Sequence, residues 1–118
     1  VHDRTDEVLE HVKKGVTAIQ CVNDRTALWI IDILRSAGFK IPEDVSVSGF
    51  DGVDEGLYNV PPLTTIVQPF EDMGRTAAAS LLKMIGGEKG YRQTYLPVEL
   101  LVKESTKALH PNGGSIGE

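Results

Sequence analysis

The chain has 118 residues, 41% of them hydrophobic and 25% charged, which fits one soluble globular domain with a modest core and excludes disorder throughout. Its formal net charge of −5 excludes the basic surface that grips a nucleic acid backbone. No apolar run approaches the roughly 20 residues that span a bilayer, and no amino-terminal signal pattern is visible. The single cysteine, Cys21, excludes an internal disulfide and fits a core position in a reducing compartment.

The first half of the chain alternates between helical and strand patterns. Apolar positions share one helical face over residues 5–14, and a short β-branched run follows over residues 17–22. Helical spacing recurs over residues 24–37 and ends at a glycine, and residues 45–50 predict a second buried strand. Two parallel strands joined by a helix form a right-handed βαβ unit, which binds ligands at the carboxyl ends of its strands.

The second half adds a loop, two strands and a helix. Residues 51–62 are acidic and rich in turn formers, which predicts a surface loop with one helical turn, and residues 63–67 predict a third strand. A helix follows from residue 70 to residue 85, with a predicted buried stripe of Met73, Ala77, Leu81, Leu82 and Ile85. Residues 95–102 alternate as a half-buried strand, in which Pro97 marks an edge or a change of sheet.

Polar side chains follow three predicted strands at the point where each one ends. Asn23 follows the first, Asp51 the second and Gln68 the third. A carboxylate can accept two hydrogen bonds from neighbouring sugar hydroxyls, and an amide offers the donor and acceptor that a polyol requires. Each residue also has a structural alternative, because Asp51 fits a turn, Gln68 fits a solvated strand end, and Asn23 or Asp24 fits a helix N-cap. Together, three such residues at three strand ends support a binding rim.

Aromatic and histidine residues are the other candidates for site components. Phe70 closely follows a strand end and can stack on a sugar, whereas Trp29 lies along a helix and fits a core or subunit interface. The histidines His2, His11 and His110 are scattered and lack metal-ligand spacing. No nucleophile motif or phosphate-binding loop occurs. The sequence therefore predicts no catalytic residue, no metal site and no cofactor.

Four segments carry a resemblance to a known family: AIQCVNDRTA, LRSAGFKIPEDVSVSGFD, PPLTTIVQPFEDMG and LPVELLVKEST. In order and separation they resemble the carboxyl-terminal part of the effector-binding core of LacI/GalR-type bacterial transcription regulators, over roughly residues 1–106. The resemblance implies an α/β fold, a three-layer Rossmann-like parallel sheet with flanking helices, in an incomplete periplasmic-binding-protein-like core. In such regulators two subdomains enclose a ligand cleft, and their movement alters how a dimer holds its operator.

The resemblance also implies roles for individual residues. It makes Asn23, Asp51 and Gln68 effector contacts and Phe70 an aromatic wall, and it implies a dimer face comprising Leu28, Trp29, Tyr58 and Asn59. The implied effector is a sugar or related polyol. The implied intact protein is a cytoplasmic homodimer without enzyme activity, which contacts DNA only through a head domain that is not in this chain. Some members of the family have two consecutive carboxylates where this chain has Asp51-Gly52. The resemblance therefore leaves open which hydroxyls of the effector are recognised.

The resemblance divides the chain between two subdomains. Residues 1–67 form the main part of the carboxyl-terminal subdomain, residues 68–97 belong to the other subdomain, residues 98–106 form a return strand, and residues 107–118 form a flexible tail. The helix within residues 68–97 then lacks its packing partner, so it must repack, associate with another copy or stay exposed.

Three alternatives remain. A periplasmic sugar-binding protein shares the cleft but does not usually combine IPEDVSVSGFD with PLTT and QP. A phosphoacceptor receiver domain also places an Asp at a strand end, but its acidic pair and its lysine are not in view. The third alternative is a role in packing or dimerisation alone.

Overall fold

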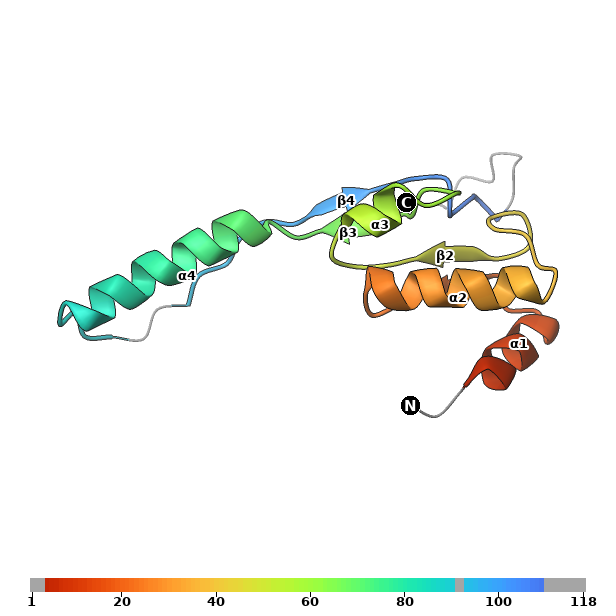
Figure 1. Ribbon diagram of the computed structural model, residues 1–118, viewed down its shortest axis with the longest axis horizontal. Helices are drawn as coiled ribbons and strands as arrows, with labels where there is room; N and C mark the ends of the chain where they lie inside the picture. Colours follow the sequence, from red (N-terminus) through yellow and green to blue (C-terminus); the bar gives the residue numbers. More distant parts are fainter. Residues whose placement is uncertain (1–3, 91–92, 110–118) are drawn as a thin grey trace, which may run out of the picture.

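The computed structural model describes residues 4–90 and 93–109 (Figure 1). The elements, in chain order, are α1 (Thr5–Lys13), β1 (Ala18–Gln20), α2 (Asp24–Ser36), β2 (Ser46–Ser48), α3 (Asp54–Leu57), β3 (Thr65–Val67), α4 (Phe70–Ile85) and β4 (Glu99–Leu101). All the predicted helices and strands are present. The strands are shorter than the apolar runs that predicted them.

The strands form a mainly parallel arrangement that aligns the candidate site residues. β1 and β2 pair in parallel, and parallel bridges from Ser48 to Thr64 and from Asp51 to Val67 continue the pairing from β2 toward β3. β4 runs antiparallel to β3. The carboxyl ends of β1, β2 and β3 therefore lie at one edge, as the βαβ pattern predicted.

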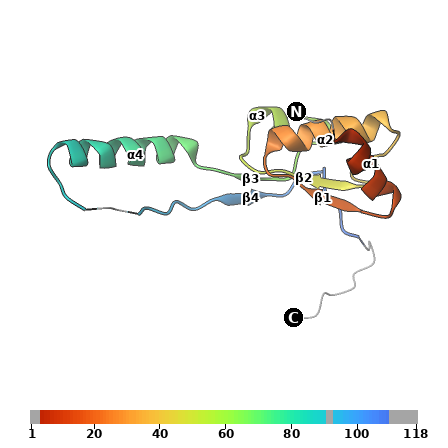
Figure 2. The same cartoon turned by 90° about the horizontal axis from the view of Figure 1, so that it is seen from below.

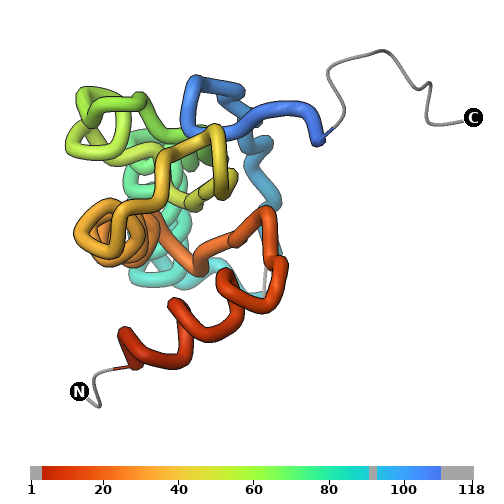
Figure 3. The backbone as a smooth tube through the Cα atoms, turned by 90° about the vertical axis from the view of Figure 1, so that its right-hand side faces the viewer, coloured from red at the N-terminus to blue at the C-terminus, as the bar shows by residue number. Residues whose placement is uncertain are grey.

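The helices α2 and α3 lie on the same side of the strands (Figures 2 and 3). On the other side of β1, the side chains of Ala18 and Gln20 are exposed. The described residues thus form a partial parallel α/β arrangement, and they do not complete the expected three layers.

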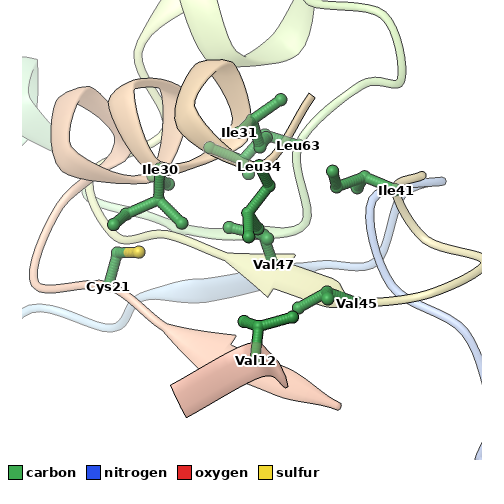
Figure 4. Close-up of a cluster of buried hydrophobic side chains, with 10 residues drawn as sticks. Val12, Cys21, Ile30, Ile31, Leu34, Ile41, Val45, Val47 and Leu63 are labelled. Atoms are coloured by element: carbon green, nitrogen blue, oxygen red, sulfur yellow. The ribbon is translucent and has the colours of Figure 1, made fainter. Parts of the chain in front are cut away.

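The core lies between α2, the strands and α1 (Figure 4). α2 buries the face with helical spacing that the sequence predicted, and the core residues are Val12, Cys21, Ala27, Ile30, Ile31, Leu34, Ile41, Val45, Val47 and Leu63. Cys21 is 5% exposed, which confirms its predicted core position.

Cys21 makes the stability of the fold depend on pH in the alkaline range. Burial raises the pKa of the Cys21 thiol from 9.0 to about 11, because desolvation disfavours the thiolate. The unfolded chain therefore loses this proton at a lower pH than the folded chain does. We expect the Cys21 contribution to the free energy of unfolding to fall between pH 9 and pH 11, by at most about 1.4 kcal/mol per pH unit. Denaturant titrations of the wild type and of Cys21→Ala check this, since the variant should lack the extra slope.

Ser105 is a buried junction between three segments of the chain. Its Oγ donates to the Val47 carbonyl at 2.6 Å and accepts from the Thr64 N–H at 2.8 Å. Its backbone carbonyl accepts from the Val47 N–H, and its N–H donates to the Pro62 carbonyl. Ser105 thus ties the returning chain to β2 and to the segment that leads into β3.

Replacing Ser105 with alanine is expected to lower the free energy of unfolding by about 2–4 kcal/mol, because two buried backbone groups lose their partner. Urea unfolding followed by circular dichroism measures this change. The exposed neighbour Glu104 provides the control, and Glu104→Ala should change stability by less than about 0.5 kcal/mol. Equal effects of the two substitutions on the free energy of unfolding would contradict the role of Ser105 as a buried junction.

α4 projects away from the rest of the molecule (Figure 1). None of its side chains is buried, and Leu82 and Ile85 are 68% and 74% exposed. The prediction of a buried stripe is therefore wrong for this chain, where Met73, Ala77, Leu81, Leu82 and Ile85 are all exposed. The physical reason is that Thr94 and Leu96, the described residues beside Met73 and Ala77, do not cover enough of this face to bury a side chain. No described helix is long and apolar enough to cross a membrane.

Candidate functional site

Asn23 is the N-cap of α2. Its backbone is extended, and its Oδ1 accepts a hydrogen bond from the Thr26 N–H at 2.8 Å. This interaction satisfies one of the free N–H groups at the helix start. The capping alternative is therefore correct for Asn23. Its Nδ2 group has no hydrogen-bond partner among the described residues, so this group remains able to donate to a ligand.

Asp51 and Gln68 form a hydrogen-bonded pair. The Gln68 Nε2 donates to the Asp51 Oδ1 at 2.7 Å, and the Gln68 N–H donates to the Asp51 carbonyl at 3.0 Å. The Asp51 N–H in turn donates to the Ile66 carbonyl. Asp51 has a φ of +116°, a conformation that residues other than glycine rarely adopt. Two of the predicted site residues are thus in direct contact, and the backbone of Asp51 is strained.

Asn23 and Asp51 line one hollow of about 560 Å³. Its other lining residues are Arg25, Leu28, Val53 and Glu55. Gln68 adjoins the hollow through Asp51, whereas Phe70 is the first residue of α4, is 53% exposed and does not line the hollow. The structure therefore brings together three of the four predicted effector contacts and leaves the fourth beside them.

Sequence reasoning missed Arg25, Val53 and Glu55 as lining residues. They follow Asn23 or Asp51 by two to four positions, but the pattern of polar strand ends identifies only the residue at each end. Asp51 and Glu55 are acidic and Arg25 is basic, so the lining carries one more negative than positive charge. A second hollow of about 580 Å³ lies between α4 and residues that follow the helix, which include Glu88, Lys89 and Thr94, and it contains none of the predicted site residues.

The four predicted dimer-face residues lie on or just beyond α2 and α3. Trp29 and Tyr58 are 43% and 83% exposed, respectively. Leu28 is half-buried and lines the hollow, and the Asn59 Nδ2 donates to the Pro61 carbonyl at 3.0 Å. Their role in a dimer stays a prediction.

The described residues contain no group of three His, Cys, Asp or Glu side chains that could hold a metal ion. His11 is exposed on α1, while His2 and His110 lie outside the described residues. Within the predicted tail, Lys107 to Leu109 are irregular and exposed. The remainder of the tail, residues 110–118, lies outside the described residues.

Comparison with known proteins identifies the family. The model for the periplasmic binding protein-like domain matches residues 2–106. The chain belongs to this family. Among curated members, it is 37% identical over 100 residues to the PurR repressor of Photobacterium profundum and 39% identical over 94 residues to the CytR repressor of Escherichia coli K12. These alignments cover 84% and 79% of the chain but only 30% and 28% of the two repressors.

Solved structures of this family agree with the assignment. A LacI family regulator from Enterococcus faecium with bound ribose has a TM-score of 0.82 and 36% identity, over 90% of this chain and 40% of that one. A second ribose-bound regulator, from Enterococcus faecalis V583, has a TM-score of 0.83 and 41% identity over the same shares. The lac repressor dimer bound to operator has a TM-score of 0.77 and 30% identity, over 88% of this chain and 37% of that one. The chain is thus the carboxyl-terminal part of a LacI/GalR-type effector-binding region, which confirms the resemblance.

Proposed function

We propose that this chain is the sugar-binding and dimerisation region of a LacI/GalR-type repressor whose DNA-binding head lies outside it. The supporting observation is the Asp51–Gln68 pair beside the hollow shared by Asn23 and Asp51. These residues combine a carboxylate acceptor, an amide donor and a second amide at one edge of the sheet, which is the chemistry that neighbouring sugar hydroxyls require.

The proposed ligand is ribose or a molecule that contains it. Two regulators with bound ribose are 36% and 41% identical to this chain, which supports a pentose over a larger sugar. Asp51 would accept from two hydroxyls, Asn23 would donate through Nδ2, and Phe70 would stack on the apolar face of the sugar ring. The proposed activity is binding and not catalysis.

The proposed organisation places the hollow as one wall of a cleft. Residues 1–67 and 98–106 form the subdomain of this wall, and residues 68–97 carry α4 into the opposite subdomain, where its apolar face would be packed. The lack of any buried side chain on α4 in this chain supports that division. The dimer face would include Leu28, Trp29, Tyr58 and Asn59.

The proposed location is the cytoplasm, where a repressor meets its operator. The curated relatives carry repressor names, which favours this interpretation over a periplasmic sugar-binding protein of a transport system. Binding of ribose would change how the intact dimer holds DNA.

Isothermal titration calorimetry of the intact protein with D-ribose tests the proposal. We expect saturable binding of one ribose per subunit and a change in operator affinity when ribose is present. Sucrose serves as the size control, and cytidine and adenosine test whether the ribose is recognised within a nucleoside. An intact, folded protein that binds none of these molecules would overturn the proposed ligand class.

A further inference from the structure

Asp24 is a buried carboxylate that makes no ion pair among the described residues. It is 0% exposed, and it opens α2 directly after the N-cap Asn23. Its Oδ2 accepts from the N–H groups of Gly52 and Val53, both at 2.8 Å, and its Oδ1 accepts from the Thr65 hydroxyl at 2.5 Å. A carboxylate is costly to remove from water unless such donors replace its hydration.

The contacts of Asp24 enclose Asp51 from both sides. The Asp24 N–H donates to the Phe50 carbonyl at 2.8 Å, just before Asp51, and the Asp24 side chain holds the two N–H groups that come just after it. Asp51 lies between these attachments with its φ of +116°. A strained conformation persists only where its surroundings fix it, and the Asp24 contacts on both sides of Asp51 add to the hydrogen bonds that Asp51 itself makes with Ile66 and Gln68.

Gly49 leaves the space that the Asp24 carboxylate occupies, and Gly56 leaves space for Leu63 beside it. A Cβ atom on Gly49 would lie 2.2 Å from the Asp24 Oδ1, which is far inside van der Waals contact. A Cβ atom on Gly56 would lie 3.5 Å from the Asp24 Oδ2 and 3.1 Å from the Leu63 Cδ2. The position of the carboxylate therefore depends on the missing side chain at Gly49 as well as on the donors of Gly52, Val53 and Thr65.

We propose that Asp24 is a positioning residue for effector binding. It fixes the turn at residues 51–53, so that the Asp51 carboxylate stays beside Asn23 and Gln68, although Asp24 itself is too buried to touch a ligand. This inference rests on the proposed function for its effect on affinity. Its structural part, the constraint on the turn, can be tested without any ligand.

The test compares Asp24→Ala, Asp24→Asn and Thr65→Val in the intact protein. Asp24→Ala frees both turn N–H groups, whereas the side-chain oxygen of the asparagine variant could still accept from both. Thr65→Val removes a bond to the same carboxylate without freeing the turn. We expect the Kd for D-ribose to rise at least tenfold in Asp24→Ala. It should stay within about threefold of the wild type in Asp24→Asn and within about twofold in Thr65→Val.

Hydrogen exchange measured by mass spectrometry supplies the readout that needs no ligand. Peptides that cover residues 50–54 should exchange at least tenfold faster in Asp24→Ala and near the wild-type rate in Asp24→Asn. Urea unfolding of all variants separates a local effect from a loss of global stability. If Thr65→Val is as destabilised as Asp24→Ala and loses as much ribose affinity, the proposal that Asp24 positions the turn at residues 51–53 is contradicted.

Val53→Pro keeps the test decisive if Asp24→Ala does not fold. Val53 has a φ of −75°, which proline adopts, so this variant removes the N–H that donates to Asp24, together with the valine side chain. Val53→Ala is the matched control for the lost side chain. We expect Val53→Pro to raise the ribose Kd at least threefold above that of Val53→Ala and to speed exchange in residues 50–54. Equal affinity and equal exchange in the two variants would overturn the inference.

If the proposed function fails, the ribose-binding and hydrogen-exchange results differ from those expected above. If the wild type does not bind ribose, the exchange data alone decide the role of Asp24 in the turn. Faster exchange in Asp24→Ala then supports the constraint on Asp51 while the ligand assignment fails, and unchanged exchange contradicts the constraint as well.

Discussion

Replacing Asp51 with asparagine in the intact protein is expected to weaken D-ribose binding by about a hundredfold. Hydrogen bonds to a charged acceptor contribute about 1.5–3 kcal/mol each, and the loss of charge at two such bonds to sugar hydroxyls gives a change of this size. The introduced asparagine can still accept from Gln68 and tolerates a positive φ, so the fold should be preserved. Calorimetric titration of the wild type and the variant measures the effect.

The matched control is Asp54→Asn, which removes the same charge from an exposed residue just beyond the turn. This variant should change ribose affinity by less than about threefold. If both variants bind ribose as the wild type does, Asp51 is not an effector contact and the site must lie elsewhere.

Replacing Gly49 with alanine is expected to lower the free energy of unfolding by about 3 kcal/mol or more. The new Cβ would lie 2.2 Å from the Asp24 Oδ1 and 3.0 Å from the Leu63 Cδ2. Overpacking alone costs about 1–3 kcal/mol, and displacement of Asp24 would also weaken its hydrogen bonds to Gly52 and Val53. Urea unfolding monitored by circular dichroism measures the loss.

Gly74→Ala is the matched control, because a Cβ at Gly74 meets nothing within 4 Å and the residue lies inside α4. Alanine there should raise stability by up to about 1 kcal/mol through helix propensity. A double variant with Asp24→Ala separates the clash from other effects of the new methyl group. Its loss should be smaller than the sum of the two single losses, since removing the carboxylate removes the closest contact.

The helices and strands were predictable because each depends on local periodicity. The spacing of Ile30, Ile31 and Leu34 places α2 against the strands without knowledge of any distant residue. The polar strand ends Asn23 and Asp51 followed from the same pattern, because parallel strands end at one edge of a sheet.

The residues that the sequence did not predict depend on contacts between distant segments. Capping explained one member of the Asn23-Asp24 pair, but only the fold reveals that Asp24 reaches 28 and 29 positions along the chain to Gly52 and Val53. Ser105 bonds to Val47, which is 58 positions away, and no local pattern distinguishes it from a surface serine. The failure at α4 has a related cause, because an apolar stripe predicts burial but does not identify the surface that buries it.

The antiparallel pairing of β3 with β4 places Val67 opposite Glu99. The chain therefore leaves the sheet and returns to it at neighbouring points, and the stretch that contains α4 is an insertion into a single hairpin. Insertions with adjacent ends can change in length or be exchanged between relatives while the host keeps its strand register. A change in the length of the stretch that contains α4 would therefore leave Asn23 and Asp51 at their places beside the strands.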